Sequence, residues 1–528
     1  MKPTAIAAVL VLLSPLTACG GNPAQIISYS PERGTIDVST AAPIRIAFDH
    51  DVDQQSVASR LSLVPATVGT VVWLGPRQLE YQHESLQPST RYEVVLDAGY
   101  KDVRGNAYAL RHHWAFITER PPSVTGSTPA NLERDVDPAS YVSIDFTREM
   151  DAATLRSAIN IVPSVPFSVR LDPTDSRRAV IAPDSLLDPS TTYTVIVSTA
   201  ALDAHGNQLF RDQTFAFQTG LARPLHHWVA FTTALADGTS GGVWIVNETG
   251  FPRQLFDAPS VQSFSWSPEG TSLLVQTARS WSAFTPGGGS TALPFSGSWA
   301  AALAAGLGYV YIDGTGTLHR WSVDGSDEVI AAKVAQAAIA PGGLRVALVQ
   351  SDGSTSTLWG YDVGLRSRYE LSFEAAALTD VSWSPAGNRI AYLRQDADST
   401  TLRVRNLTGQ AATVTVATGD IGHPTWLPDS THLVFAASVA TPGSPLRRAF
   451  LVSAIAPPAA LTAALAIPST GSFEVTNPVP SPDGHQIAFV SNDQVWMMNA
   501  DGTRPTALTR FDAASFPYSC RTPAWTKV

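Results

Sequence analysis

Three carboxylates at alternate positions, Asp49, Asp51 and Asp53, have a residue type and spacing that could do chemistry. Clustered carboxylates are the ligands that hard cations such as Ca²⁺ prefer. A corresponding segment later in the chain offers only Asp145, Glu149 and Asp151. Alternate residues on an extended strand point to opposite faces, so three such carboxylates do not converge on one ion. We therefore predict a turn at this segment and no metal ligand.

The segment Gly238–Gly242 matches the G-x-S-x-G pattern around a nucleophilic serine. That chemistry needs the serine on a sharp turn between a strand and a helix, with His and Asp placed beside it. Here the serine lies in a Gly-rich link between two apolar runs, so the match reads as coincidence. Cys520 is a lone thiol without an evident base, and the pairs His112–His113 and His226–His227 lack partners at ligand spacing. The sequence predicts no catalytic residue, no metal site and no cofactor.

Length and charge narrow the class of protein. A chain of 528 residues is too long for one ordinary core, so we expect three or more domains. The net charge of -10, without any run of Lys or Arg, argues against a nucleic-acid surface. Only two cysteines occur, Cys19 and Cys520, and we expect no disulfide between them because the sulfur of Cys19 is expected to be modified.

The first residues have the pattern of an export signal. Lys2 precedes an apolar run from Ala5 to Leu13, which is too short for a comfortable membrane span. Leu16–Cys19 resembles the lipobox of bacterial lipoproteins, which implies cleavage between Ala18 and Cys19 and lipidation of Cys19. Residues 1–18 would be removed and residues 19–25 would form a lipidated tether. The alternative is an ordinary secretory signal with a chance cysteine.

The resemblance also bears on location. Several acyl chains on Cys19 would give stable membrane anchoring, where one chain is marginal. Gly20 follows the cysteine, where an Asp would favour retention at the inner membrane in enteric bacteria. We therefore expect a membrane-anchored lipoprotein at the outer membrane, the cell surface or in the periplasm.

The region after the tether contains a duplication. Equivalent blocks recur in the same order, and the later blocks keep one constant offset. They pair Leu86–Tyr92 with Leu187–Tyr193, Asp102–Asn106 with Asp203–Asn207, and Trp114–Thr118 with Phe215–Thr219. Apolar residues alternate within each copy, which is typical of antiparallel strands in a β-sandwich. Asp102 and Asp203 are expected to close Asx-type turns before Gly-Asn.

These blocks resemble the bacterial Ig-like domains of surface-layer (SbsA-type) and other surface proteins. The shared segments include L-x-P-x-T-x-Y, D-x-x-G-N and a closing F-x-F-x-T; the first copy has Val52 where the second has Met150. The resemblance implies two modules, residues 26–120 and 121–220, that act as spacers or adhesive stalks. Pro121–Pro122 marks a stiffened boundary between them.

The rest of the chain repeats a turn followed by an apolar strand. The copies align on the turn proline at Pro268, Pro341, Pro385, Pro428 and Pro482, with a degenerate copy near Ala302. Tandem repeats of about forty residues predict a propeller or solenoid. Trp228–Phe231 reads as a second strand without a first, and Pro523–Val528 reads as a first strand with nothing after it. We therefore expect a ring closed by the C-terminal strand, with seven blades or, alternatively, six.

The repeat Trp-Ser-Pro-Asp-Gly followed by Ile-Ala-Phe resembles the TolB-like (WD40-like, PD40) propeller repeat, over residues 222–528. The resemblance implies blades of four strands and binding of proteins or peptides on one face or in the central channel. The anchor tryptophans could form a ligand-stacking ring, but their recurrence favours packing between blades; they are Trp266, Trp383, Trp426 and Trp525. Turn chemistry explains the Asp-Gly pairs better than cation binding; these begin at Asp324, Asp352, Asp483 and Asp501.

Together these patterns predict a cell-envelope lipoprotein whose Ig-like stalk presents a propeller to a protein, peptide or glycan partner, with no enzymatic activity. The insertion between Ala437 and Phe473 is the segment most expected to contact a partner, because loops carry recognition. Two alternatives stay open. The propeller could be a hydrolase or lyase with an active site in its channel, or the protein could be a structural component of a surface layer.

Overall fold

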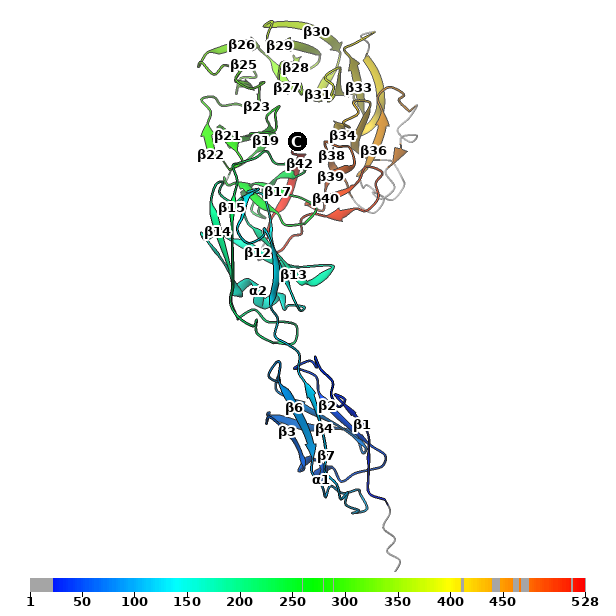
Figure 1. Cartoon of the computed structure of the whole chain (residues 1–528). Helices are drawn as coiled ribbons and strands as arrows, with labels where there is room; N and C mark the ends of the chain where they lie inside the picture. The colour runs from blue at the N-terminus through cyan, green and yellow to red at the C-terminus, as the bar shows by residue number, and fades with distance from the viewer. Residues whose placement is uncertain are drawn as a thin grey trace, which may run out of the picture.

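The computed structural model describes residues 22–258, 260–278, 280–287, 289–409, 413–438, 447–458, 465–466, 474–513 and 516–527. Within these ranges the regular structure is strand, apart from two short helices, α1 (Gln54–Ala58) and α2 (Ala152–Ala158). The all-β prediction is therefore confirmed. Figure 1 shows an elongated molecule, in which two sandwiches follow one another and a ring of sheets forms the far end. No helix in the described ranges is long and apolar enough to cross a membrane.

The first module is a sandwich of two sheets, with strand orders β1-β2-β5-β4 and β3-β6-β7. Its strands are β1 (Ile26–Ser30), β2 (Ile44–Phe48), β3 (Leu61–Val64), β4 (Gly69–Gly75), β5 (Gln78–His83), β6 (Arg91–Leu96) and β7 (His112–Ile117). The predicted alternation holds, because Tyr92 and Val94 of β6 are buried in one core with Ile44 and Ile46 of β2.

The second module repeats this plan with sheets β12-β13-β10-β8 and β11-β14-β15-β9. Its strands are β8 (Val124–Thr128), β9 (Glu133–Val136), β10 (Val142–Phe146), β11 (Ile159–Val162), β12 (Phe167–Asp172), β13 (Asp175–Pro183), β14 (Thr192–Val197) and β15 (Gln213–Thr219). Tyr193 and Val195 are buried with Val142 and Ile144, as in the first copy. The two copies are thus duplicates in structure as well as in sequence.

The helices α1 and α2 explain the carboxylates that open the sequence. Asp53 caps α1 by accepting the N–H of Ser56 at 3.2 Å, and Asp151 caps α2 by accepting the N–H of Ala153 at 2.9 Å. Asp49 accepts the N–H of Gln25 at 2.8 Å, and Asp51 pairs with Arg77 at 2.7 Å. Each carboxylate therefore has its own partner at a turn or cap, which confirms the turn prediction.

The remaining strands form a ring of sheets (Figure 1). Four sheets hold four consecutive strands each. They are β19 (Ser263–Trp266), β20 (Leu273–Gln276), β21 (Trp281–Thr285) and β22 (Gly289–Ala292); β23 (Trp299–Ala302), β24 (Tyr309–Ile312), β25 (Leu318–Trp321) and β26 (Asp327–Ala331); β27 (Val334–Ile339), β28 (Arg345–Ser351), β29 (Ser356–Asp362) and β30 (Ser367–Glu374); and β38 (Thr476–Pro480), β39 (Gln486–Ser491), β40 (Gln494–Asn499) and β41 (Thr506–Ala507).

One larger sheet contains β31 to β37 in order. Its strands are β31 (Ala377–Trp383), β32 (Arg389–Gln395), β33 (Thr400–Asn406), β34 (Thr413–Trp426), β35 (His432–Ser438), β36 (Arg447–Ser453) and β37 (Leu465–Ala466). The first half of β34 pairs with β33 and its second half with β35, so one strand ends one blade and begins the next. Seven blades would require dividing this sheet at β34; the number seven stays a prediction, with six as the alternative.

The ring is closed by strands from opposite ends of the region, as predicted. β42 (Ser519–Trp525) joins β16 (Val229–Ala234), β17 (Ser240–Val246) and β18 (Arg253–Phe256) in the order β18-β17-β16-β42. In the antiparallel ladder, Val229 lies opposite Trp525 and Thr233 opposite Cys520. β42 is therefore the fourth strand of this sheet, on the side of β16 that faces the ring centre. It completes the sheet and closes the ring.

A buried charge on β42 tests this closure. Cys520 is fully buried in the core that contains Val229 and Phe231. We expect Cys520→Asp to destabilise the ring by about 3–5 kcal/mol, because the new carboxylate is buried without a partner. Calorimetry should show a lower unfolding temperature for the ring and unchanged unfolding of the first module.

The matched control is Arg521→Asp, an exposed neighbour on the same strand, which should change stability by about 0.5 kcal/mol or less. Equal effects of the two substitutions, or an unchanged ring transition in Cys520→Asp, would contradict the closure by β42.

Candidate functional sites at the domain junctions and in the ring

The D-x-x-G-N segments fold as identical turns in the two modules. Asp102 accepts the N–H groups of Arg104 and Asn106 at 2.9 and 2.8 Å, as predicted for an Asx-type turn. Asp203 accepts those of His205 and Asn207 at 2.9 and 2.8 Å. The second turn differs in its position, because it lies where the first module ends.

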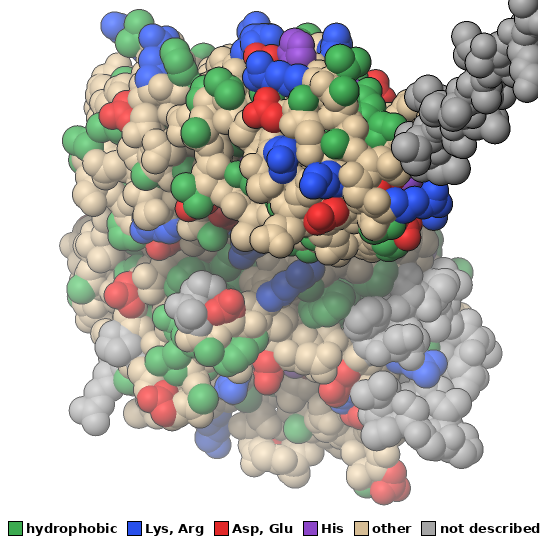
Figure 2. All heavy atoms as spheres, turned by 90° about the horizontal axis from the view of Figure 1, so that it is seen from below, with side chains coloured by type: hydrophobic (Ala, Val, Ile, Leu, Met, Phe, Trp, Pro, Cys, Tyr) green, Lys and Arg blue, Asp and Glu red, His purple; other side chains and the backbone are tan. Residues whose placement is uncertain are grey.

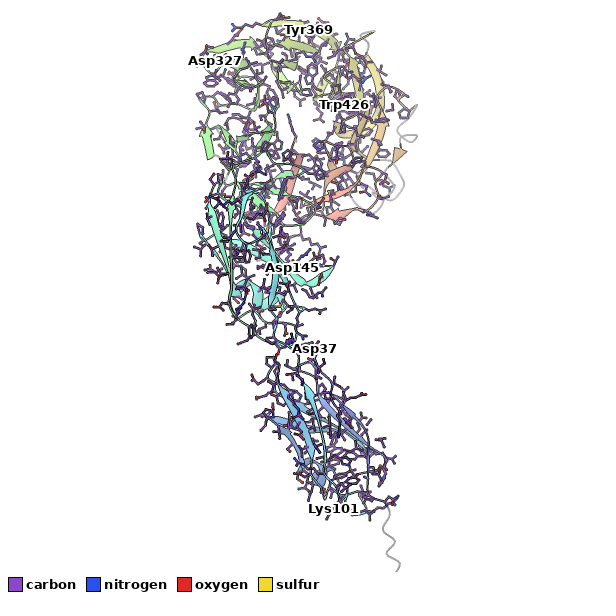
Figure 3. The ribbon with its side chains drawn as sticks, in the orientation of Figure 1. Asp37, Lys101, Asp145, Asp327, Tyr369 and Trp426 are labelled. Carbon is purple, nitrogen blue, oxygen red and sulfur yellow. The ribbon has the colours of Figure 1, made fainter. Side chains whose placement is uncertain are left out.

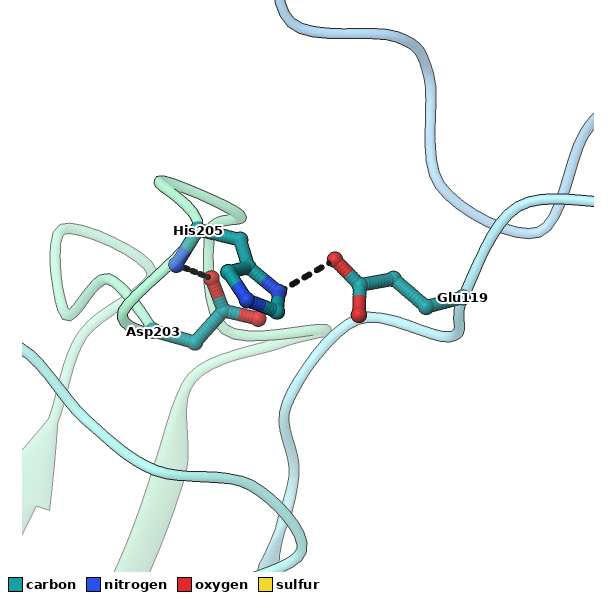
Figure 4. Close-up of side chains that lie close together, drawn as sticks. All are labelled: Glu119, Asp203 and His205. Carbon is teal, nitrogen blue, oxygen red and sulfur yellow. Dashed lines mark hydrogen bonds and ion pairs between the residues drawn. The ribbon is translucent and has the colours of Figure 1, made fainter. Parts of the chain in front are cut away.

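Glu119, just after β7, connects the two modules. Its side chain is 2% exposed. One carboxylate oxygen, Oε1, accepts the N–H of Thr40 at 3.1 Å and Nδ2 of Asn207 at 2.9 Å, and it lies 2.8 Å from Nδ1 of His205 (Figure 4). The other oxygen accepts Nη1 of Arg148 at 2.8 Å. Groups from both modules therefore meet on one buried carboxylate.

Further contacts surround this carboxylate. Arg148 also pairs with Asp37 of the first module, and the Thr40 hydroxyl donates to Oδ1 of Asn207 at 2.7 Å. Burial by itself raises the pKa of Glu119, but hydrogen bonds from Thr40, Asn207 and His205 outweigh it, so the pKa lies below the ordinary value. The carboxylate is thus ionised and well satisfied at neutral pH.

Glu119, Asp203 and His205 also form a group that could hold a metal ion, since a ligand atom from each lies within 4.8 Å of the others. The contacts of these three side chains do not fit metal binding. Both Glu119 and Asp203 accept N–H donors, and the guanidinium of Arg148 already neutralises Glu119. A cation would have to displace these donors and approach a positive charge. The arrangement is that of an ion-pair and hydrogen-bond network across a domain junction.

Sequence reasoning missed this network. A signal was present, because the copies differ there: Glu119 corresponds to Gly220, and His205 corresponds to Arg104. Residues that break an otherwise faithful duplication are candidates for a role that only one copy performs.

Arg253 of β18 forms the second junction. It is 0% exposed, and its Nη1 and Nη2 donate to the carbonyls of Ala139 and Ser140 at 2.7 and 2.9 Å. Its guanidinium lies 4.2 Å from the ring centroid of Tyr141 and 5.6 Å from that of Trp228. Burial lowers the pKa of Arg253 to about 10, which leaves it charged at neutral pH.

Other contacts extend this junction along the first sheet of the ring. The N–H of Gln254 on β18 donates to the carbonyl of Asp184 at 2.8 Å, so the second module covers part of this outer edge. Nη1 of Arg170 donates to the carbonyl of Gly250 at 3.0 Å. The apolar cluster that contains Trp228 and Trp266 also packs against Tyr141 and other residues of the second module. The second module and the ring therefore share a core.

The anchor tryptophans join successive inner strands of the ring, which confirms the packing interpretation. Nε1 of Trp383 donates to the carbonyl of Ala338 at 3.0 Å, and Nε1 of Trp426 to that of Ser382 at 3.3 Å. Nε1 of Trp525 donates to Val479 in the same way at 2.9 Å. Trp266 is buried as well, although its Nε1 has no acceptor among the described residues.

The Asp-Gly pairs are turns. In each, the carboxylate accepts the backbone N–H two residues further on, and the pKa of the aspartate is lowered. The four residues are Asp324, Asp352, Asp483 and Asp501. Hydrogen bonds within the turn account for these carboxylates, as predicted.

The serine, cysteine and histidine residues singled out in the sequence have contacts that explain them without catalysis. Ser240 accepts the N–H of Gly242 at 3.1 Å inside β17. Burial raises the pKa of the Cys520 thiol to about 12, so it carries no thiolate. His113 pairs with Glu93 at 2.7 Å, and His227 lies 2.9 Å from Oε1 of Gln486. Ala18, Cys19 and most of the insertion between Ala437 and Phe473 lie outside the described residues.

The fold thus defines a class: two Ig-like sandwiches followed by a propeller-like ring of sheets. Comparison with family models agrees for the first part. Residues 21–118 and 118–219 match the bacterial Ig-like domain, and these two segments belong to that family. No curated protein sequence matches the chain.

Several solved structures are similar over the ring. TolB from Acinetobacter baumannii is 11% identical, with a TM-score of 0.38, covering 71% of this chain and 85% of that one. A putative TolB from Agrobacterium tumefaciens is 15% identical, with a TM-score of 0.35, covering 57% and 99%. An oligogalacturonate lyase in complex with manganese is 13% identical, with a TM-score of 0.40, covering 54% and 85%.

Removing the charge of Glu119 tests the first junction. We expect Glu119→Gln to weaken it by about 1.5–3 kcal/mol, because hydrogen bonds to a charged group are lost and an amide is placed against the Arg148 guanidinium. Small-angle scattering should show a larger spread of module orientations. Glu84→Gln, an exposed glutamate of the same module, should leave the scattering unchanged; equal curves for wild type and Glu119→Gln would contradict the role of Glu119.

The lowered pKa of Glu119 gives the junction a pH dependence. Because the folded pKa lies below the ordinary value of about 4.3, the stabilisation is complete above that value and is lost as the pH falls through the lowered one. Scattering of the wild type should therefore be constant from neutral pH to about pH 5 and change at lower pH. The change should be absent in Glu119→Gln, and a pH effect of the same size in that variant would assign it to other groups.

Arg253 provides the corresponding test of the second junction. Arg253→Lys keeps the charge but loses the planar fork that reaches both carbonyls, so we expect a loss on the order of 2 kcal/mol. Calorimetry should show the second module and the ring unfolding together in the wild type and separately in the variant. Arg177→Lys, at an exposed pair within the second module, is the control; a single shared transition in Arg253→Lys would contradict the role of the guanidinium.

Proposed function

We propose that this chain is a lipid-anchored protein of the bacterial cell envelope. Residues 1–18 are its signal peptide, Cys19 carries the lipid, and residues 19–25 are the tether. The Ig-like modules, residues 26–120 and 121–220, form a stalk. The propeller, residues 222–528, binds a protein, peptide or glycan partner.

The observation that carries the proposal is the pair of buried polar junctions, at Glu119 and at Arg253. A flexible linker would be sufficient if the domains only had to be connected. Here a buried carboxylate and a buried guanidinium, each with partners from two domains, hold the domains in one arrangement. Such a stalk holds a binding domain at a set distance and direction from its attachment point.

The attachment point supports this arrangement. Ala24 is buried, and its carbonyl accepts the hydroxyl of Tyr100 at 2.9 Å, so the chain is fixed to the first module a few residues after Cys19. Figure 3 shows Lys101, the neighbour of Tyr100, at the end of the molecule away from the ring, whereas Asp37 lies at the junction and Tyr369 at the far side of the ring. A lipid on Cys19 would therefore leave the whole stalk between membrane and propeller.

The surface at that end is consistent with anchoring through lipid. Figure 2 shows the molecule from that end, and acidic and basic side chains are interspersed over the described surface that it presents. A protein held at a membrane by charge alone would need a concentrated basic patch. Acyl chains on Cys19 supply the anchoring instead.

Replacing the lipidated residue tests the anchor. We expect Cys19→Ser to abolish labelling by fatty acids and to release the protein from membranes into the soluble fraction. Ser367→Cys, which adds an exposed thiol far from the leader, is the control for labelling of cysteine as such. Continued labelling of Cys19→Ser, or membrane retention without label, would contradict the lipoprotein assignment.

The binding role needs a second experiment. The lipidated chain, solubilised from membranes in detergent, should capture a partner from envelope extracts. Cys520→Asp, with its ring destabilised, should not capture it, whereas Arg521→Asp should. Turnover of a small substrate without any captured partner would favour the enzyme alternative instead.

A further inference from the structure

Four neighbouring inner strands of the ring share one irregularity. In β31, β34, β38 and β42, two residues are opposed by one on the partner strand, so each contains one extra residue. These strands follow one another around the ring centre (Figure 1). A bulge of this kind interrupts pairing and redirects a side chain. The inner strands β19 and β23 have no such shift, and the shift in β27 lies elsewhere along the strand.

Each of the four bulges places a non-glycine residue in the left-handed region of backbone conformation. The φ angles are 52° at Asp380, 53° at His423, 50° at Asn477 and 48° at Thr522. Each residue precedes the anchor position of its strand by three; the anchors are Trp383, Trp426, Pro480 and Trp525. Non-glycine residues in this region are strained, and such residues cluster at functional sites.

The four positions share one backbone conformation but carry four different side chains. The four side chains offer a carboxylate, an imidazole, an amide and a hydroxyl. His423 and Thr522 are exposed, and Asp380 and Asn477 are partly exposed. We call these four residues the bulge arc. A construction element common to all blades would occur in every inner strand, whereas this one occupies one side of the ring and presents different polar groups at one level.

The same geometry narrows the class of ligand. An extended peptide that adds to an inner strand needs a regular edge, and the bulges interrupt four of these edges. The ligand is therefore read by side chains. The arc combines hydrogen-bond donors and acceptors and has a single carboxylate, which suits hydroxyl groups that both donate and accept. Phe264 on β19 and Trp299 on β23 pack against hydrophobic cores of the ring, so the binding surface proposed below consists of the polar side chains alone.

We propose that the bulge arc of Asp380, His423, Asn477 and Thr522 binds a neutral oligosaccharide. The inference rests on the proposed function, because it names the ligand class of the propeller. The hydroxyl groups of the oligosaccharide are bound by the polar side chains of the arc. Thr522 already bonds the hydroxyl of Thr232 at 2.9 Å, so the other three side chains have the larger share in binding.

Glycine substitution separates binding from folding at these positions. Glycine adopts a positive φ without strain, so the triple variant Asp380→Gly, His423→Gly, Asn477→Gly should keep the unfolding temperature of the ring. It removes the side chains proposed to bind. Arg366→Gly is the matched control, because Arg366 has a φ of 50° at an exposed turn outside the arc. The pair Asp380→Asn and Asn477→Asp changes the chemistry with little change of shape.

Titration calorimetry with the full chain in detergent would use chitotriose, cellotriose and maltotriose as probes. We expect at least one to bind the wild type and Arg366→Gly equally, and to bind the triple variant at least about tenfold more weakly. The isosteric variants should bind more weakly without any change in unfolding temperature. Failure of all three sugars to bind, or binding by the triple and isosteric variants as tight as that of the wild type, would overturn the inference. A protein captured from extracts equally by wild type and triple variant would overturn it too, while leaving the proposed function standing.

Discussion

The hydrogen-bonded ladder between β16 and β42 is the interaction on which the rest of the structure depends. It joins strands nearly three hundred residues apart in the chain, as in the contact between Trp228 and Thr526 at a separation of 298. The ladder completes the sheet that also contains β18, and β18 carries Arg253 into the second module. Ring closure and attachment to the stalk are therefore properties of one sheet. A change that opens the ring would also loosen the junction.

The two junctions use buried charge where most domain contacts use exposed polar surface. A buried charge is costly unless it is hydrogen-bonded, so it tolerates few alternative geometries. Glu119 finds its donors, and Arg253 its two carbonyl acceptors, only in the observed arrangement. Each junction thereby favours the observed orientation, and we expect the stalk and the ring to move as one body. The bulge arc then has a fixed position relative to the attachment end.

The sequence predicted what local patterns encode. The alternation of apolar residues predicted the strands of the two sandwiches, and the Asp-Gly pairs predicted turns. The recurrence of tryptophan predicted contacts between blades. The incomplete units at the two ends of the repeat region predicted the closing strand. The junctions were not predicted, because Glu119 and Asn207 are 88 residues apart, and Arg253 and Ala139 are 114 apart. Nothing in the local pattern at Asp380 or His423 indicates a bulge, because a register shift is a relation between two strands.

The most direct test of a single rigid body is a distance measured across both junctions. Spin labels at Ile36 of the first module and Phe511 of the ring, both exposed, would report it by pulsed electron resonance. The account predicts one narrow distance distribution for the otherwise native protein, broadened when Glu119→Gln or Arg253→Lys is introduced. A broad distribution in the unsubstituted chain would contradict the claim that the modules and the ring form one body.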